Sequence, residues 1–323
     1  MNVIEKSWYQ KFGITWLLLP LSALFYLITL YRFNRKRKLQ LATDKPKVIV
    51  VGNIAVGGTG KTPFTLFLVD YLKQKGLSVA VISRGYGGQT QSQPLLVTEK
   101  VSPEVCGDEP KLIAVRTGEP VVVCPNRNLS IDYLKKHINP DVIIADDGLQ
   151  HYQMARAMEL CIVDGKRRFG NGFVMPAGPL REAKSRLKHV DLTITNGTAV
   201  DNGYQLAVDG VYGIIDGQKV SNLDSPVYLV SAIGNPSRFE QSVNEQNILV
   251  HGHTIFKDHH TYSESDFDAL DGAILMTEKD AVKCQSFAKA NWYYLKVTAK
   301  PTKQLVDKLD QLLIEKGIHN HGV

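Results

Sequence analysis

The sequence predicts an α/β fold, a mostly parallel sheet flanked by helices, in which one strand leads into a phosphate-binding loop of the P-loop NTPase type. Two observations predict it. Short β-branched runs alternate with amphipathic segments through much of the chain, as expected for βαβ units. The stretch from Lys47 to Phe64, KVIVVGNIAVGGTGKTPF, also joins a strand of buried type to a glycine-rich loop and then to a helical pattern. Loop amides and a helix N-terminus in that order bind phosphate oxygens.

The composition predicts a globular protein, and the length predicts two domains. The chain has 323 residues, more than one average domain, with 44% hydrophobic and 22% charged residues. The net charge of +6 is modest and partly concentrated near the N-terminus. The cysteines are far apart and form no C-x-x-C pair, which predicts neither a zinc site nor a disulfide framework and favours a reducing compartment. They are Cys106, Cys124, Cys161 and Cys284.

A segment near the N-terminus has the character of a membrane helix. The stretch from Ile14 to Tyr31 carries no charge and approaches the roughly 20 residues that span a bilayer as a helix. Basic residues that favour anionic lipid follow at once: Arg32, Arg35, Lys36, Arg37 and Lys38. A cleaved signal peptide fits poorly because its basic residues come first, and a core helix is the other alternative. We interpret residues 1–40 as a membrane anchor that spans the bilayer or lies in its interface, with the remainder in the cytoplasm.

The glycine-rich loop is the predicted nucleotide-phosphate site. Its residues are Ala55, Val56, Gly57, Gly58, Thr59, Gly60, Lys61 and Thr62. We expect Lys61 to reach the outer phosphates and the Thr62 hydroxyl to ligate Mg²⁺. Ala55 stands where the usual pattern has glycine, but Gly57 and Gly58 still let the backbone approach phosphate closely. An ordinary glycine-rich turn is the alternative, and the lysine, the hydroxyl and the flanking pattern together disfavour it.

The next two strands end in arginine-bearing turns. A helix from Phe64 to Lys75 precedes a strand from Val79 to Ile82, and the turn SRGYGG follows with Arg84. Ligands gather at the carboxyl ends of strands in open α/β sheets, so Arg84 is a candidate anion-binding residue. A solvated arginine in a flexible loop is an equally good interpretation. The strand from Val121 to Cys124 is followed in the same way by Arg127.

An acidic strand end provides the second strong signal. The stretch from Pro140 to Asp147, PDVIIADD, is apolar and ends in two aspartates, in the manner of a Walker-B element that holds the Mg²⁺ of a nucleotide. Acidic residues end many strands of α/β proteins, and the upstream P-loop favours the functional interpretation. Gln150 and His151 follow and are positioned to reach a substrate.

Two further loops carry charged residues. Asp108 and Glu109 precede an apolar helix and, taken alone, serve as its N-terminal acids. A long glycine- and proline-bearing stretch then contains Arg181 and Glu182, and long loops of this kind are often functional. The strand from Asp191 to Thr195 closes the P-loop domain, for which we expect residues 41–200.

A second, smaller α/β domain follows a hairpin. The stretch from Tyr204 to Val220 contains two Asp-Gly pairs between apolar alternations, which predicts a β-hairpin linker over residues 201–224. Four strand-like runs with intervening helical patterns predict the domain over residues 225–323. Two clusters stand out in it, Asp258-His259-His260 and Thr277-Glu278-Lys279-Asp280. Adjacent histidines on a strand face opposite sides, so they form no obvious metal pair.

The ordered motifs together resemble one known family. They are GNIAVGGTGKTP, SRGYGG, GDEP, DDGLQH, PAGPLRE, FKDHHTY and MTEKDAVK, preceded by the apolar N-terminal helix. This set, which covers nearly the whole length, strongly resembles the tetraacyldisaccharide 4′-kinases, the lipid A 4′-kinases of Gram-negative bacteria. The resemblance implies transfer of the γ-phosphoryl group of ATP to the 4′-hydroxyl of a tetraacylated glucosamine disaccharide 1-phosphate, forming lipid IVA. It implies catalysis on the cytoplasmic face of the bacterial inner membrane, with ATP and Mg²⁺ as cofactors.

The resemblance also implies roles for individual residues. Lys61 would neutralise the β- and γ-phosphates, and Thr62 with Asp146 would hold Mg²⁺. Asp108 would be the base on the sugar hydroxyl, paired with a histidine of the second domain, for which we prefer His259 over His260. Asp147 and Glu182 would be acidic neighbours of the metal. The positions matching residues near nucleotide or substrate are Arg84, Arg127, Gln150, His151 and Arg181.

The expected partners are the lipid substrate and the membrane surface, with no nucleic acid and no obligate protein partner. A membrane-tethered NTPase switch is the second hypothesis from the residues. The Asp108 and His259 pair distinguishes the two, because a kinase needs a group outside the P-loop that activates the acceptor. A switch needs a group that positions water instead.

Overall fold

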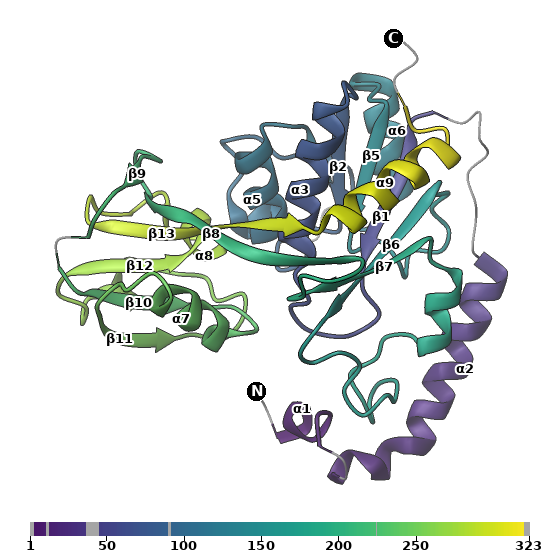
Figure 1. Ribbon diagram of the computed structural model, residues 1–323, viewed down its shortest axis with the longest axis horizontal. Helices are drawn as coiled ribbons and strands as arrows, with labels where there is room; N and C mark the ends of the chain where they lie inside the picture. The colour runs from purple at the N-terminus through teal and green to yellow at the C-terminus, as the bar shows by residue number, and fades with distance from the viewer. Residues whose placement is uncertain (1–2, 11–12, 37–44, 90–91, 224, 320–323) are drawn as a thin grey trace.

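The computed structural model describes residues 3–10, 13–36, 45–89, 92–223 and 225–319. One continuous 13-stranded sheet runs through it in the order β11-β10-β12-β13-β8-β7-β6-β1-β5-β2-β4-β3, with β9 paired to β8. The sheet has two parts, one built on the P-loop strand and a smaller one from the second half of the chain (Figure 1). The predicted α/β class with a mostly parallel sheet and a smaller second unit is confirmed.

The first part contains the strands and helices that the sequence pattern predicts, with small shifts at their ends. Its elements are β1 (Lys47–Gly52), α3 (Lys61–Gln74), β2 (Val79–Ser83), β3 (Leu95–Leu96), α4 (Pro103–Cys106), α5 (Asp108–Thr117), β4 (Val121–Val123), α6 (Arg127–His137), β5 (Val142–Asp146), β6 (Met158–Asp164), the 3-10 helix η2 (Lys184–His189) and β7 (Leu192–Asn196).

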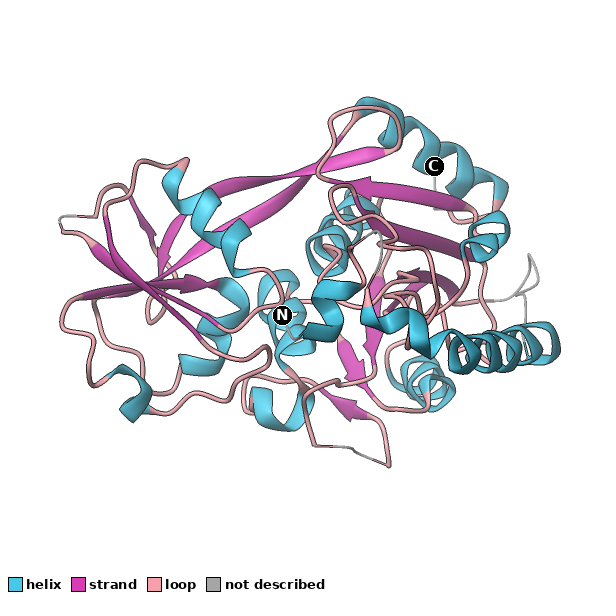
Figure 2. Cartoon of the chain, turned by 90° about the horizontal axis from the view of Figure 1, so that it is seen from below, coloured by secondary structure: helices cyan, strands magenta, loops and turns pink. Residues whose placement is uncertain are grey.

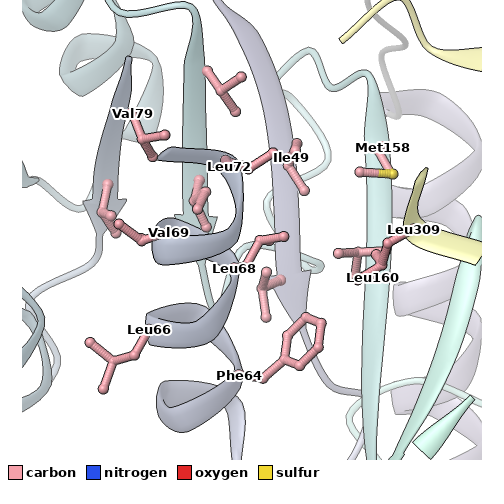
Figure 3. Close-up of a cluster of buried hydrophobic side chains, with 14 of the residues drawn as sticks. Ile49, Phe64, Leu66, Leu68, Val69, Leu72, Val79, Met158, Leu160 and Leu309 are labelled. Carbon is pink, nitrogen blue, oxygen red and sulfur yellow. The ribbon is translucent and has the colours of Figure 1, made fainter. Parts of the chain in front are cut away.

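The central strands of this part are buried on both faces. β1 lies between β5 and β6 and is parallel to both, with Val50 opposite Ala145 on one side and Glu159 on the other. Parallel strands covered by helices need apolar residues throughout, which explains the continuous Val-Ile-Val-Val run of β1. α3 packs on this sheet through Phe64, Leu68 and Leu72 (Figure 3). The P-loop therefore joins two elements that the core fixes on both sides.

The second part continues the sheet through a long antiparallel ribbon. Its elements are β8 (Gly203–Gly213), β9 (Lys219–Val220), β10 (Val227–Ser231), α7 (Pro236–Asn244), β11 (Val250–Ile255), the 3-10 helix η3 (Glu264–Phe267), β12 (Ala273–Thr277), α8 (Glu278–Cys284), β13 (Trp292–Pro301) and α9 (Lys303–Glu315). β8 pairs with β13 from Tyr204 opposite Pro301 to Gly213 opposite Tyr293. Figure 2 shows these two long strands connecting the two parts.

The predicted hairpin forms only at its tip, and the last helix belongs with the first core. β8 and β9 pair over two positions, whereas the connecting ribbon is made by β8 and β13. α9 returns to the P-loop part, where Leu305 and Leu309 share a core with Ile49 and Phe64. The sequence-based division into residues 201–224 and 225–323 places this helix in the second domain, whereas its packing places it on the first.

The N-terminal segment forms a separate layer on the surface. It comprises α1 (Val3–Ser7), the 3-10 helix η1 (Ile14–Leu18) and α2 (Leu19–Lys36). Among the described residues, the stretch Thr15–Arg35 is long and apolar enough to cross a membrane, and only 6% of its most apolar window is buried. Core packing therefore does not account for its apolar residues. Arg37 and Lys38 of the predicted basic flank lie outside the described residues.

One face of α2 is attached to the protein and the other is exposed. Ser22 Oγ donates to Val174 O at 2.8 Å and accepts from Ala177 N at 2.9 Å. On the outer face Leu21 is 54% and Leu27 is 60% exposed, and Leu17, in η1 just before the helix, is 81% exposed. An exposed apolar stripe of this kind on an anchored helix suits the hydrocarbon edge of a bilayer.

Candidate active site

The P-loop backbone is held in place by side chains of two neighbouring strands. Gly57 and Gly60 have φ of 98° and 93°, the left-handed region that favours glycine. Asn196 Nδ2, from the end of β7, donates to Thr59 O at 2.9 Å, and Tyr204 Oη, from β8, donates to Gly60 O at 2.6 Å. A Cβ on Gly60 would collide with both side chains. The sequence does not predict these contacts with the P-loop, because neither Asn196 nor Tyr204 belongs to a nucleotide-binding motif.

Ala55, the departure from the usual glycine, lies in extended pairing with the long loop. It forms an antiparallel bridge with Leu180, and Val56 N donates to Pro179 O at 2.8 Å. Ala55 is buried in a small apolar cluster with Val174 and Leu180, against which α2 packs. The long loop predicted to be functional therefore connects the P-loop to the N-terminal helix.

Lys61 and Arg181 converge on Asp147. Lys61 Nζ lies 3.6 Å from Asp147 Oδ1, and Arg181 Nη1 lies 2.9 Å from Asp147 Oδ2. Burial raises the pKa of this carboxyl, but the two cations outweigh it and hold the pKa at about 2. Asp147 is therefore anionic, and its charge holds the side chains of Lys61 and Arg181 beside the P-loop.

Asp146 is a buried carboxylate with oxygen chemistry suited to Mg²⁺. Its Oδ1 accepts from Thr65 Oγ1 at 3.1 Å, and burial, aided by the charge of Glu109, raises its pKa to about 7. A nearby cation stabilises the ionised form of a buried carboxyl whose pKa is raised. Thr62 lies in the first turn of α3, three residues before Thr65. The hydroxyl and the carboxylate fit Mg²⁺, which binds one or two protein oxygens and takes the rest of its ligands from phosphate and water.

Glu182 is held by hydrogen bonds from several side chains. Gln150 Nε2 donates to Oε1 at 2.7 Å, Tyr152 Oη donates to Oε2 at 2.7 Å, and Arg186 Nε lies 3.2 Å from Oε2. Among the described residues no group of three or more acids, histidines or cysteines is arranged to hold a metal. The places of Asp147 and Glu182 beside the metal therefore stay predictions.

Arg84, Arg127 and His151 lie at the same sheet edge. Arg127 is buried at the start of α6, and its Nη2 donates to Asp147 O at 3.1 Å. Burial lowers the pKa of His151 to about 4, with Arg127 adding to the effect, so its imidazole is neutral at physiological pH. Arg84 follows β2 and is exposed. All three lie at the carboxyl ends of the strands, where the sequence predicted ligand contacts.

The structure brings His259 of the second part to Asp108 of the first. His259 Nδ1 lies 3.0 Å from Asp108 Oδ2 and 3.2 Å from Oδ1. His259 has φ of 62°, and its ring meets Tyr86 of the SRGYGG turn edge to face at 5.1 Å. His260 instead lies 3.2 Å from Asp266 and stacks on Phe256. Of the two histidines, His259 is the one that contacts Asp108.

Lys279 completes the group around Asp108. Its Nζ lies 3.5 Å from Asp108 Oδ2 and 3.2 Å from Glu109 Oε1. Burial raises the pKa of Asp108, but the hydrogen bond from His259 and the charge of Lys279 outweigh it and lower the pKa below its usual range. The hydrogen bond with Asp108 in turn raises the pKa of His259. The sequence marked the Thr277–Asp280 cluster but gave no reason to place Lys279 in the site.

A second ion pair fastens the two parts together nearby. Arg116 Nη1, in α5, contacts both carboxylate oxygens of Glu278 at the start of α8, at 2.7 and 2.5 Å. The Asp108–His259 contact lies at the other end of α5. The contact of Asp108 with His259 therefore forms only when the two lobes, the first and second parts of the molecule, are closed on each other.

These features together define a P-loop phosphotransferase. They are a P-loop with its lysine and hydroxyl, an acidic strand end, and a carboxylate–imidazole pair outside the phosphate loop. In a kinase such a pair would serve the acceptor hydroxyl, which a simple NTPase lacks.

Comparison with known proteins identifies the family. The sequence model of LpxK, tetraacyldisaccharide-1-P 4′-kinase, matches residues 14–314. The tetraacyldisaccharide 4′-kinase of Pseudoalteromonas translucida is 50% identical over 99% of both chains, and that of Haemophilus influenzae is 44% identical over 91% of both. The crystal structure of LpxK from Aquifex aeolicus in complex with ATP is 28% identical, with a TM-score of 0.79, over 94% of this chain and 99% of that one. The chain belongs to the tetraacyldisaccharide-1-P 4′-kinase family, and the resemblance inferred from its motifs is confirmed.

Proposed function

We propose that this chain transfers the γ-phosphoryl group of ATP to the 4′-hydroxyl of tetraacyldisaccharide 1-phosphate, the step of lipid A biosynthesis that forms lipid IVA. The observation that carries the residue assignment is the contact of Asp108 with His259 across the two lobes. Family membership supports the reaction, and the ATP complex of the Aquifex aeolicus relative supports ATP as the donor.

The P-loop side binds the donor. The amides from Ala55 to Thr62 and the N-terminus of α3 surround the phosphates, and Lys61 exchanges its contact with Asp147 for the β- and γ-phosphates. Arg181, on the same carboxylate, supplies a second positive charge to the transferring group. Thr62 and Asp146 would hold Mg²⁺, which, when bound, neutralises charge that develops on the phosphate oxygens.

The contact between the two lobes activates the acceptor. Asp108 removes the proton of the 4′-hydroxyl as the oxygen forms its bond to the γ-phosphorus and the bond from that phosphorus to ADP breaks. His259 donates from Nδ1 to Asp108 and fixes the direction of the carboxylate, while Lys279 keeps it ionised. The lowered pKa of Asp108 makes it a weak base. Besides accepting the proton, Asp108 orients the hydroxyl, as suits phosphoryl transfer, in which positioning contributes much of the rate.

The N-terminal helix brings the site to its lipid substrate. The exposed face of α2, including Leu21 and Leu24, would lie in the cytoplasmic leaflet of the inner membrane. The acyl chains of the acceptor then stay in the bilayer while the disaccharide reaches the P-loop and Asp108. This arrangement needs a membrane surface and the lipid, and it needs neither nucleic acid nor an obligate protein partner.

Acceptor dependence tests the proposal against the NTPase alternative. ADP formation by purified full-length protein is measured in detergent micelles with and without tetraacyldisaccharide 1-phosphate, together with phosphate incorporated into lipid. The proposal expects ADP formation to require the acceptor and to equal the phosphate incorporated. Acceptor-independent release of free phosphate would favour a nucleotide-driven switch.

A further inference from the structure

The loop that follows β11 holds His259 in an uncommon backbone conformation. We call residues 257–260 the histidine loop. His259 has φ of 62°, in the left-handed region that a residue with a side chain seldom adopts. Its Nδ1 nevertheless lies 3.0 Å from Asp108 Oδ2 on the other lobe. Because the left-handed conformation is not favoured by the residue itself, contacts with the surrounding structure must maintain it.

Two backbone groups of the histidine loop have partners outside it. His259 N donates to Ala232 O, just after β10, at 3.3 Å. Lys283 Nζ, from α8, donates to His260 O at 3.0 Å. These contacts lie before and after the His259 side chain along the chain, so together they restrict the direction in which its imidazole points.

One buried carboxylate supports both of these contacts. Asp280 is fully buried, and its Oδ2 accepts from Ala232 N at 3.1 Å. Its Oδ1 lies 2.8 Å from Lys283 Nζ, and Thr277 Oγ1 donates to Oδ2 at 2.6 Å. Asp280 therefore positions both Ala232 and Lys283 against the histidine loop.

The ion pair of Asp280 and Lys283 is costly to desolvate. Lys283 is only 7% exposed, and its Nζ lies 4.8 Å from the centre of the Tyr262 ring. A buried ion pair contributes little net stability, although loss of one partner leaves the other charge uncompensated. Its clearest consequence is therefore geometric, in the backbone of the histidine loop.

We propose that Asp280 and Lys283 are positioning residues for phosphoryl transfer, whose ion pair holds the histidine loop so that His259 meets Asp108. The inference rests on the proposed function, because it takes the pair of Asp108 and His259 as the group that activates the acceptor. Asp280 and Lys283 act through His259 and do not themselves touch the reacting atoms.

A direct effect of the Lys283 charge on Asp108 is the alternative. Both residues line a small pocket beside His259, so the ammonium group is close enough for its charge to act there. Asp280→Asn separates the two roles, because it breaks the ion pair and keeps the cation. A charge effect needs only Lys283, whereas the positioning role needs both members of the pair.

The experiment compares variants of the ion pair with a buried control in the same lobe. Phosphate transfer to tetraacyldisaccharide 1-phosphate is measured in micelles with full-length Asp280→Asn, Lys283→Met and Lys283→Arg, and Lys283→Met is also combined with His259→Ala. Val243→Ala is the matched control, since Val243 is buried in a different apolar cluster from Ala281 of α8. It lowers stability by opening a cavity and leaves the histidine loop in place. Urea titrations establish that each variant is folded under the assay conditions.

The proposal expects kcat to fall about 10- to 100-fold in Asp280→Asn and in Lys283→Met, because a misplacement of about 1 Å costs up to roughly 10²-fold in rate. KM for ATP stays that of the wild type, and Lys283→Arg, which keeps a cationic donor, recovers part of the loss. Because Lys283 acts through His259, Lys283→Met should add less than about 3-fold to the loss that His259→Ala causes. Val243→Ala keeps the kcat of the wild type.

Asp280→Asn with the kcat of the wild type would overturn the proposal, and this nearly isosteric variant decides the question even if Lys283→Met does not fold. An equal loss of kcat in Val243→Ala would also overturn it, as would losses from Lys283→Met and His259→Ala that multiply in the combined variant. A wild-type protein that transfers no phosphate to the lipid would instead refute the proposed function, and the inference with it.

Discussion

Replacing Asp108 by asparagine tests the acceptor side of the site most sharply. The substitution is nearly isosteric and keeps a polar group within reach of His259, whose Nδ1 lies 3.0 Å away, but an amide cannot accept the hydroxyl proton. A positioned general base contributes about 10²–10⁴ in rate, which corresponds to roughly 3–5 kcal/mol in the barrier. We expect kcat to fall within that range.

The control for this variant lies one residue away. Glu109→Gln removes the neighbouring carboxylate, which contacts Lys279 at 3.2 Å but not His259, and we expect kcat to fall less than about 10-fold. Turnover is assayed by phosphate transfer to lipid, and ATP affinity is measured by calorimetry without acceptor. Because Asp108 lies away from the P-loop, its replacement should leave ATP affinity unchanged. Turnover of Asp108→Asn equal to the wild type, in a protein that binds ATP normally, would refute the assignment.

Three further predictions concern the contact between the lobes. An NMR titration of the histidines should place the pKa of His259 above the ordinary value of about 6.5, and in Asp108→Asn this pKa should fall toward the ordinary value. The ion pair of His259 with Asp108 is therefore present below the raised pKa and is lost as the pH rises through it. An unshifted pKa would contradict the contact. Lys279→Met should raise the pKa of Asp108 and move the acid limb of kcat to higher pH, whereas Lys279→Arg should restore it; superimposable pH profiles would exclude this role. Arg116→Met should lower the free energy of unfolding by about 1–3 kcal/mol in urea titrations by leaving Glu278 buried without its cation, and Arg116→Met/Glu278→Met should recover part of that loss. Equal stability of the single variant and the wild type would show that the pair contributes nothing.

The sequence predicts local elements of this fold well because their physical causes are local. The strand of β1 is a continuous apolar run, the loop after it is rich in glycine, and α3 has its apolar residues at helical spacing. α9 has the same local signals but packs on the first lobe. The sequence of an amphipathic helix shows which of its faces is apolar, but not which sheet that face will cover. A division by sequence order alone therefore assigned it to the second lobe.

The candidate site likewise has parts that the sequence predicts and parts that it does not. The P-loop and the acidic strand end are each a continuous stretch of sequence, so the sequence alone identifies them. The contact of Asp108 with His259 joins positions 151 residues apart, and only the family resemblance indicated it before the structure placed the two side chains together. Lys279 had no such motif, and its place beside Asp108 depends on how the two lobes close on each other.

The position of the transferred phosphate is the measurement that tests the central claim most directly. Full-length protein in micelles is incubated with γ-labelled ATP, Mg²⁺ and tetraacyldisaccharide 1-phosphate, and the recovered lipid is examined by ³¹P NMR and mass spectrometry. The account predicts one added, labelled phosphate on the 4′-oxygen, formed in the wild type and nearly absent with Lys61→Ala. Unmodified lipid with all label in free phosphate, or label on a different oxygen, would contradict it.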